Sequence, residues 1–135
     1  MIWIDLITVL ALLQYVVFGV LVARAHKTYG VQPPAMTGHP VFERYYRVQM
    51  NTLELLVVFL PALWLASNYW EPGWLVAAGA MYLVGRVIYC RAYVSDPSTR
   101  TFGFALSVAP IVLLLAAVVV GIAITAVEGL SLIHI

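Results

Sequence analysis

Residues 42–54 read FERYYRVQMNTLE, and this charged stretch runs directly into an apolar segment of membrane-spanning length. Two glutamates and two arginines lie within it. An ionisable group at membrane depth is costly, so such groups are usually paired, face a protein interior and mark a binding or reaction site. We therefore expect the functional site to be built around this stretch.

The composition is that of an integral membrane protein. Of 135 residues, 64% are hydrophobic and 10% are charged, and the mean hydropathy is +0.98. The net charge of +1 comes without a basic, aromatic-rich patch, which argues against nucleic acid as a partner. A single cysteine, Cys90, excludes an intrachain disulfide and is expected to be a small buried hydrophobe. No cluster of cysteine and histidine predicts a metal site.

Charge-poor runs predict four membrane-spanning helices, because each is close to or above the roughly 20 residues that cross a bilayer. The runs are Leu6–Ala23, Val48–Trp70, Pro72–Tyr93 and Thr101–Val127. We expect an all-α four-helix bundle with up-down topology, formed by one domain of residues 1–128. Residues 129–135 are treated as a tail, for which a non-native origin stays open. The N-terminus has no basic region of the signal-peptide type, so the first helix is expected to be retained.

The basic residues predict the orientation in the membrane. All seven lysines and arginines flank the first and third loops, whereas the second loop, residues 67–73, has none. The positive-inside rule then places the first and third loops in the cytoplasm and both termini on the opposite side. We expect a bacterial inner-membrane protein whose polar site opens near the cytoplasmic face.

Helical periodicity gathers the polar residues into two stripes. One face of the second span carries Glu43, Arg47, Asn51 and Glu54, while Gln49 points the opposite way. The stripe on the third span consists of Tyr82, Arg86, Tyr89 and Tyr93. Two such stripes favour a ligand between them.

A purely structural interpretation is that Glu43–Arg47 and Glu54–Arg86 are ion pairs that hold helices together. The excess of arginines over carboxylates argues that these charges also bind a ligand. Four arginines (Arg24, Arg47, Arg86 and Arg100) converge on one end of the bundle against two carboxylates. Arginine binds carboxylates through a two-pronged fork, so the surplus positive charge favours an organic acid as ligand.

The stretch 42–54 resembles the second-helix signature E-R-x-x-R-x-x-x-N-x-x-E of the MAPEG family, the membrane-associated proteins of eicosanoid and glutathione metabolism. The similarity includes Pro33-Pro34, residues 61–64 and residues 81–89, reaches Arg100, and covers about residues 5–125. It implies a homotrimer of four-helix subunits that binds glutathione between adjacent subunits near the cytosolic side.

The resemblance also implies roles for individual residues. In one subunit, glutathione would be held by Arg47, Asn51 and Glu54 of the second span and by Tyr89 and Tyr93 of the third. Arg86, on the same face of the third span as the two tyrosines, is also assigned to this site. Gln49 would reach it from the neighbouring subunit. Arg100 matches the arginine that stabilises the glutathione thiolate, which makes it the expected catalytic residue. The family has a ligand-binding arginine on its first helix, which we assign to Arg24. In an alignment through Pro33-Pro34, however, His26 and Lys27 lie nearer to that position. For Arg24 and Lys27, a role as membrane-surface anchors stays open.

Three functions compete. The leading one is a glutathione transferase or peroxidase that attacks a lipophilic electrophile or hydroperoxide arriving from the bilayer. The second is a non-catalytic lipid-binding or lipid-presenting member of the same family, against which Arg100 argues. The third is a small drug/proton antiporter, which would need an acid deep in the first helix, and Leu6–Ala23 has none. His39, in a loop rich in glycine and proline, is expected to be exposed and without a role.

Overall fold

A computed structural model describes residues 2–133 as four long helices and one short 3-10 turn. The helices are α1 (Ile2–Tyr29), α2 (Pro40–Ala66), α3 (Pro72–Ser95) and α4 (Thr101–Ile133), and the turn η1 (Pro97–Thr99) joins α3 to α4. Each long helix is long and apolar enough to cross a membrane. No strand occurs within residues 2–133, so the prediction of an all-α membrane bundle is confirmed.

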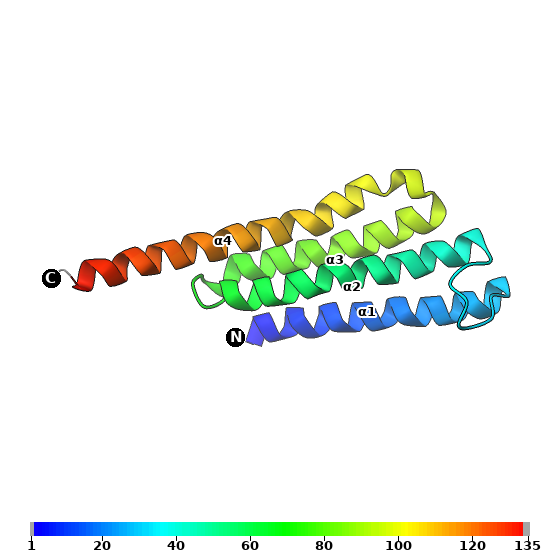
Figure 1. The fold of residues 1–135 in the computed structure, drawn as a ribbon, viewed down its shortest axis with the longest axis horizontal. Coiled ribbons are helices and arrows are strands. Elements are labelled where there is room, and N and C mark those ends of the chain that lie inside the picture. Colours follow the sequence, from blue (N-terminus) through cyan, green and yellow to red (C-terminus); the bar gives the residue numbers. More distant parts are fainter. Residues whose placement is uncertain (1, 134–135) are drawn as a thin grey trace.

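The four helices run up and down beside one another (Figure 1), as predicted. Both ends of the described chain and the α2–α3 turn lie at one end of the bundle, and the α1–α2 and α3–α4 connections lie at the other. The α4 helix extends beyond the bundle at its C-terminal end. Residues 129–133 of the expected tail continue this helix, and residues 134–135 lie outside the described part. The side of the membrane that each end faces stays a prediction.

Local signals explain where the helices begin and end. The α1 helix ends before Gly30, whose φ of 69° is the left-handed conformation that commonly follows a helix. The α2 helix begins with Pro40 at its first position. The His39 ring accepts a hydrogen bond from the backbone N–H of Val41 at 3.1 Å and lies 4.5 Å from the Tyr29 ring. His39, expected to be exposed, is half-buried and has a structural role, because its ring nitrogen caps α2.

The main apolar core lies in the half of the bundle that holds the termini. Its fully buried members include Ile4, Phe59, Leu75 and Leu114, one from each helix. The Phe59 ring stacks on Tyr82 with a centroid distance of 4.0 Å and an interplanar angle of 6°. Packing in this half therefore holds the helices together independently of the polar half.

The α3 and α4 helices approach each other closely through two glycines. A Cβ atom at Gly103 would lie 2.5 Å from the backbone nitrogen of Tyr89, and one at Gly85 would lie 2.7 Å from that of Ser107. Small residues allow this kind of backbone approach between membrane helices. The contact fixes the start of α4 against the polar part of α3.

Candidate functional site

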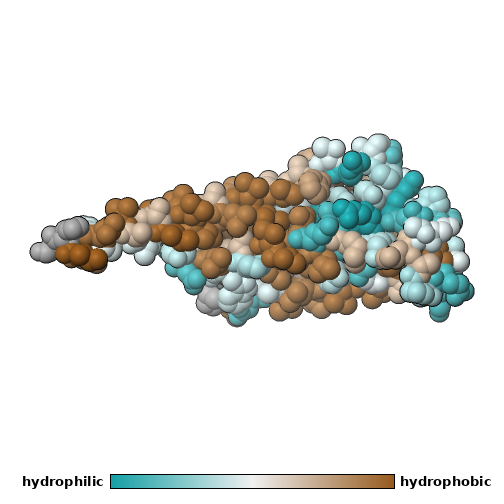
Figure 2. Space-filling view, viewed as in Figure 1, coloured by the Kyte–Doolittle hydropathy of each residue, from teal (hydrophilic) through white to brown (hydrophobic). Residues whose placement is uncertain are grey.

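Hydrophilic surface gathers at the end of the molecule that carries the α1–α2 and α3–α4 connections (Figure 2). A hydrophilic strip continues from there over α2 and α3 toward the middle of the molecule, which is otherwise strongly apolar. This distribution matches the polar stripes expected on the second and third spans.

One recess on this surface brings residues of three helices together. It measures about 450 Å³ and is lined by Arg47, Asn51, Tyr89, Tyr93, Arg100 and Phe104. Five of these six residues were predicted site residues; Phe104 was not. We refer to this set as the anion recess, because its lining carries two guanidinium groups and no carboxylate.

Helical spacing explains how the recess is built. Arg47 and Asn51 lie four residues apart on α2, and Tyr89 and Tyr93 lie four apart on α3, so each pair shares a face. The two tyrosine rings stack with centroids 5.4 Å apart, and Phe104 lies 6.1 Å from Tyr89. Tyr89 is buried whereas Tyr93 is half-buried, so the rings form one wall that runs from the interior to the surface.

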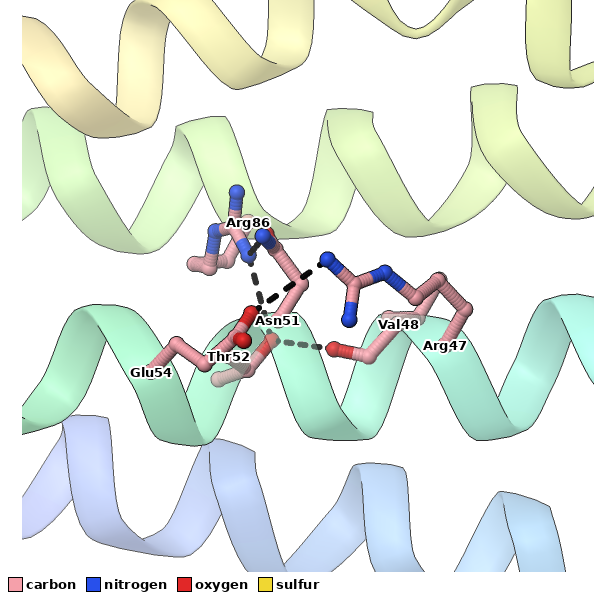
Figure 3. A network of polar contacts seen from close by, with 6 residues as sticks. All are labelled: Arg47, Val48, Asn51, Thr52, Glu54 and Arg86. Atoms are coloured by element: carbon pink, nitrogen blue, oxygen red, sulfur yellow. Dashed lines mark hydrogen bonds and ion pairs between the residues drawn. The ribbon is translucent and has the colours of Figure 1, made fainter.

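Arg47 pairs with Glu54 along the surface of α2 (Figure 3). Arg47 Nη2 lies 3.4 Å from Glu54 Oε1, and the two side chains are 50% and 60% exposed. The ion pairs Glu43–Arg47 and Glu54–Arg86 considered from the sequence were wrong, since Arg47–Glu54 is the only ion pair within residues 2–133. Glu43 instead accepts a hydrogen bond from the backbone N–H of Gly38 at 3.2 Å.

Arg86 lies behind the wall of the anion recess rather than in its lining. The side chain is fully buried. Its Nη1 donates to Asn51 Oδ1 at 2.7 Å and to Thr52 Oγ1 at 3.2 Å, and its Nε donates to Ser107 Oγ at 2.9 Å. The expected direct contact between Arg86 and a ligand is therefore not supported by its placement, because periodicity gives the face of a residue but not its depth.

Arg100 projects from the connection that leads into α4. It is exposed, and its Nη1 donates to the backbone oxygen of Pro97 at 2.9 Å. The preceding turn is fixed by Asp96, whose Oδ1 accepts from the Ser98 hydroxyl at 2.8 Å and from the Ser98 N–H at 3.1 Å. The hydrogen bond from the Ser98 hydroxyl, followed by that from its backbone N–H, lowers the pKa of the Asp96 carboxyl below its ordinary value.

Arg44 is a structural residue that the sequence analysis did not assign. Its Nη1 donates to the backbone oxygen of Val94 at 3.0 Å, so it caps the C-terminal end of α3. The sequence could have indicated that Arg44 lies near the end of α3, because up-down topology places the start of α2 beside the end of α3. The pairing itself needs the three-dimensional register of the two helices.

Two predicted site residues lie elsewhere on the same subunit. Arg24 is exposed and lines a second pocket of about 240 Å³ with neighbours such as Thr28 and Tyr45. Gln49 packs beside Gly19 of α1, where an added Cβ would lie 2.9 Å from its Nε2. Neither residue lines the anion recess. Within the chain, the predicted site residues are therefore divided between two faces.

The first-helix alternatives to Arg24 lie in other surroundings. His26 Nδ1 lies 2.8 Å from the backbone oxygen of Val31, and its ring packs 4.4 Å from that of Phe42. Lys27 is exposed beside a different pocket. Of the three, Arg24 alone combines an exposed cation with a pocket that contains residues of α2, namely Tyr45.

Comparison with known proteins identifies the chain's relatives. The model of the MAPEG family matches residues 4–120. Human microsomal glutathione S-transferase 2 is 35% identical over 117 residues, which cover 87% of this chain and 80% of that protein. Leukotriene C4 synthase of Cavia porcellus is 35% identical over 116 residues, covering 86% and 77%. The uncharacterized protein sll1147 of Synechocystis sp. is 47% identical over 106 residues, covering 78% and 77%.

Proposed function

Because the chain belongs to the MAPEG family, we propose that it is a membrane-bound glutathione transferase that also reduces lipophilic hydroperoxides. Relatives named for glutathione S-transferase and leukotriene C4 synthase activity, at about one third identity, support a glutathione-using enzyme. That this enzyme catalyses both conjugation and hydroperoxide reduction is our proposal. Detoxification of apolar electrophiles is the role that such chemistry would serve.

The observation that carries the proposal is the lining of the anion recess. Glutathione has two carboxylates, one ammonium group and a thiol. Arg47 and Arg100 offer guanidinium donors to negative groups, and Asn51 and the tyrosines offer neutral polar groups. Glu54, half-exposed beside Arg47, offers a carboxylate for the ammonium group. The chemistry of these side chains fits a small peptide acid.

Arg100 is the residue we assign to catalysis. The thiolate, and not the thiol, is the nucleophile, and a neighbouring cation favours the ionised form. When bound, glutathione supplies this sulfur nucleophile. Arginine has five N–H donors, and the bond to Pro97 accounts for one nitrogen of the Arg100 guanidinium. The remaining donors are available to stabilise negative charge at the mouth of the recess.

The second half of the site is proposed to come from a neighbouring subunit. Arg24 and Gln49 lie outside the anion recess of their own chain, so we assign them to the recess of another copy. A homotrimer with cyclic symmetry would bring these residues of each subunit against the recess of the next. We place the resulting sites near the cytoplasmic face of a bacterial inner membrane, in accordance with the positive-inside rule.

The second substrate is expected to arrive from the bilayer. Exposed apolar side chains cover the outer faces of the helices, and Phe104 lines the recess at the start of α4. An apolar electrophile dissolved in lipid can therefore reach the recess without crossing water. The residues give no preference for an eicosanoid over any other apolar electrophile.

Purified protein in detergent provides the direct test. We expect native mass spectrometry to detect retained glutathione, and we expect conjugation of an aryl halide and glutathione-dependent reduction of a lipid hydroperoxide. Ophthalmate, in which a methyl group replaces the thiol, should compete for binding and support neither reaction. Binding without either reaction would favour the lipid-presenting alternative. Absence of glutathione binding would overturn the proposed function.

A further inference from the structure

The buried arginine of α3 has an unusual set of partners. Arg86 is 0% exposed, and all its hydrogen-bond acceptors are neutral side chains: Asn51, Thr52 and Ser107. Figure 3 shows Arg86 extending from α3 toward Asn51 and Thr52 of α2. No carboxylate lies within ion-pair distance of Arg86 in the part of the chain that the structure describes.

Helix packing alone does not account for this residue. Arg86 Nη2 is buried and has no hydrogen-bond partner among the described residues, and an uncompensated charge is expensive inside a protein or membrane. The hydroxyls of Thr52 and Ser107 already donate to the carbonyl oxygens of Val48 and Gly103 in their own helices, at 2.8 and 2.7 Å. Each hydroxyl proton is therefore already used within its own helix, and the hydroxyl oxygens serve Arg86 only as acceptors.

Asn51 is the partner whose orientation depends on Arg86. Arginine carries only donors, so the atom of Asn51 that faces it must be the carbonyl oxygen Oδ1. The amide NH₂ of Asn51 then points away from Arg86. The fully buried unpartnered atoms of residues 2–133 are Gln14 Oε1, Tyr82 OH and Arg86 Nη2. Asn51 Nδ2 is not among them, although it makes no hydrogen bond to another residue of the described part. Asn51 lines the anion recess.

Arg86 also holds the aromatic wall. Its Cζ lies 4.4 Å from the centroid of the Tyr89 ring, within the range of a cation–π contact. Tyr89 stacks on Tyr93, which completes the wall. Arg86 thus touches two of the residues that line the recess while lying outside the recess itself.

We propose that Arg86 is a positioning residue that fixes the amide of Asn51, so that the recess presents hydrogen-bond donors at this position. Because only donors face the cavity there, the position accepts a carboxylate of the ligand and disfavours a group that must donate. The inference rests on the proposed function, since the carboxylate in question belongs to glutathione.

A double-mutant cycle on glutathione affinity tests the coupling. Isothermal titration of the purified protein with glutathione should give about tenfold weaker binding for Arg86→Met, which has no donor, and for Asn51→Ala, as expected for loss of one hydrogen bond to a charged group. The double variant should also bind about tenfold more weakly, and not about a hundredfold, because both changes remove the same oriented donor. Additive losses, or unchanged affinity in Arg86→Met, would overturn the inference.

Three further variants separate positioning from stability. Arg86→Lys keeps a donor toward Asn51 Oδ1 and should retain affinity within about threefold. Ser107→Ala removes a different Arg86 contact and should lower the thermal midpoint with affinity within about twofold of wild type. Asn51→Asp would pair with Arg86 and keep the fold, yet lose the donors, so its affinity should fall at least tenfold. Wild-type affinity in a folded Asn51→Asp variant would overturn the inference.

The wild-type measurement distinguishes the two proposals. If the wild type retains no glutathione, the proposed function fails and the positioning role fails with it. If the wild type binds glutathione and the Arg86 variants bind it equally well, the positioning role alone fails.

Discussion

At the scale of single residues, Arg100 carries the sharpest expectation. Arg100→Ala should lower turnover by about a hundredfold, comparable to removing one preorganised electrostatic stabiliser, with a much smaller change in glutathione affinity. The variant should recover part of its rate as the pH rises past about 8.5, where a thiol ionises without assistance. Steady-state kinetics across pH, with Arg100→Lys as the charge-preserving control, provide the measurement. Unchanged turnover in Arg100→Ala would remove this residue from the mechanism.

The ion pair of α2 separates binding from stability. Because Arg47 and Glu54 are half-exposed, their pairing is expected to contribute only about 0.2–1 kcal/mol to the free energy of unfolding. Arg47→Ala and Glu54→Gln should therefore unfold close to the wild-type temperature but bind glutathione at least about tenfold more weakly. Calorimetry and thermal unfolding together check this. Glu128→Gln, which changes an exposed carboxylate at the far end of α4, is the matched control, and normal binding in both test variants would place the ligand elsewhere.

The sequence predicted well on which face of a helix a residue lies, but it predicted poorly how deeply the side chain is buried. Periodicity placed Arg47 and Asn51 on one face of α2, and the recess joins them. The same rule grouped Arg86 with Tyr93, yet Arg86 is fully buried and Tyr93 reaches the surface. Depth depends on how closely a neighbouring helix approaches, and here the glycines of the α3–α4 contact decide it. A single helix carries no signal for that distance.

At the scale of helices, the contact at Gly103 should be indispensable. In Gly103→Ala the new methyl group would meet the backbone of Tyr89 at 2.5 Å, which no rotamer change can relieve. We expect a loss of about 1–3 kcal/mol in stability, typical of overpacking, and weaker glutathione binding because Arg100 and Tyr89 would move apart. Gly129→Ala on the same helix has nothing within 4 Å and should match the wild type in thermal unfolding and binding. Equal behaviour of the two variants would contradict this account of the α3–α4 contact.

The turn between α3 and α4 should respond to acid. Since the Ser98 hydrogen bonds lower the pKa of Asp96 in the folded protein, the ionised carboxylate stabilises the fold at neutral pH. This contribution is present above the pKa of the unfolded chain and is lost as the pH falls through the lower, folded value. Thermal unfolding from neutral to acidic pH should show the loss in the wild type. In Asp96→Asn the Ser98 bonds can persist without a titrating group, so its difference from the wild type should shrink in acid; a constant difference would exclude the effect.

The helices themselves were predictable because membrane thickness and charge-free length leave few alternatives. Three of the four expected spans lie within observed helices, whereas the second, Val48–Trp70, was predicted too long because α2 ends at Ala66. The Pro33-Pro34 and Asp96-Pro97 signals fall between helices. The final helix runs past the predicted end at Val127 to Ile133, since Glu128 is a good helix former and no proline follows it. The cap by His39 was missed because histidine is an uncommon N-cap residue. Pro40, at the first position of α2, is a helix-start signal that the sequence analysis did not use.

At the scale of the whole molecule, a site shared between subunits predicts complementation. In the proposed trimer each site combines the anion recess of one chain with Arg24 and Gln49 of the next. Arg47→Ala damages the first half, and the double change Arg24→Ala with Gln49→Ala damages the second, so each homotrimer should lose glutathione turnover. In trimers mixed at random in equal amounts, about a quarter of the interfaces join two intact halves, so about that fraction of wild-type turnover should return.

Co-expression with two different affinity tags, followed by sequential purification, isolates the mixed trimers. Each mixed trimer has one intact interface out of three, so turnover in this purified fraction should rise to about a third of the wild-type value. The control mixes Arg47→Ala with Arg100→Ala, which damage the same recess. No interface in that mixture has an intact recess, so turnover should stay at the level of the single variants. Recovery in the control would reveal exchange of intact protein. Absence of recovery in the test mixture, with mixed trimers verified by native mass spectrometry, would require that every residue needed for turnover acts within one chain. The proposed placement of Arg24 and Gln49 against the recess of a neighbouring subunit would then be overturned.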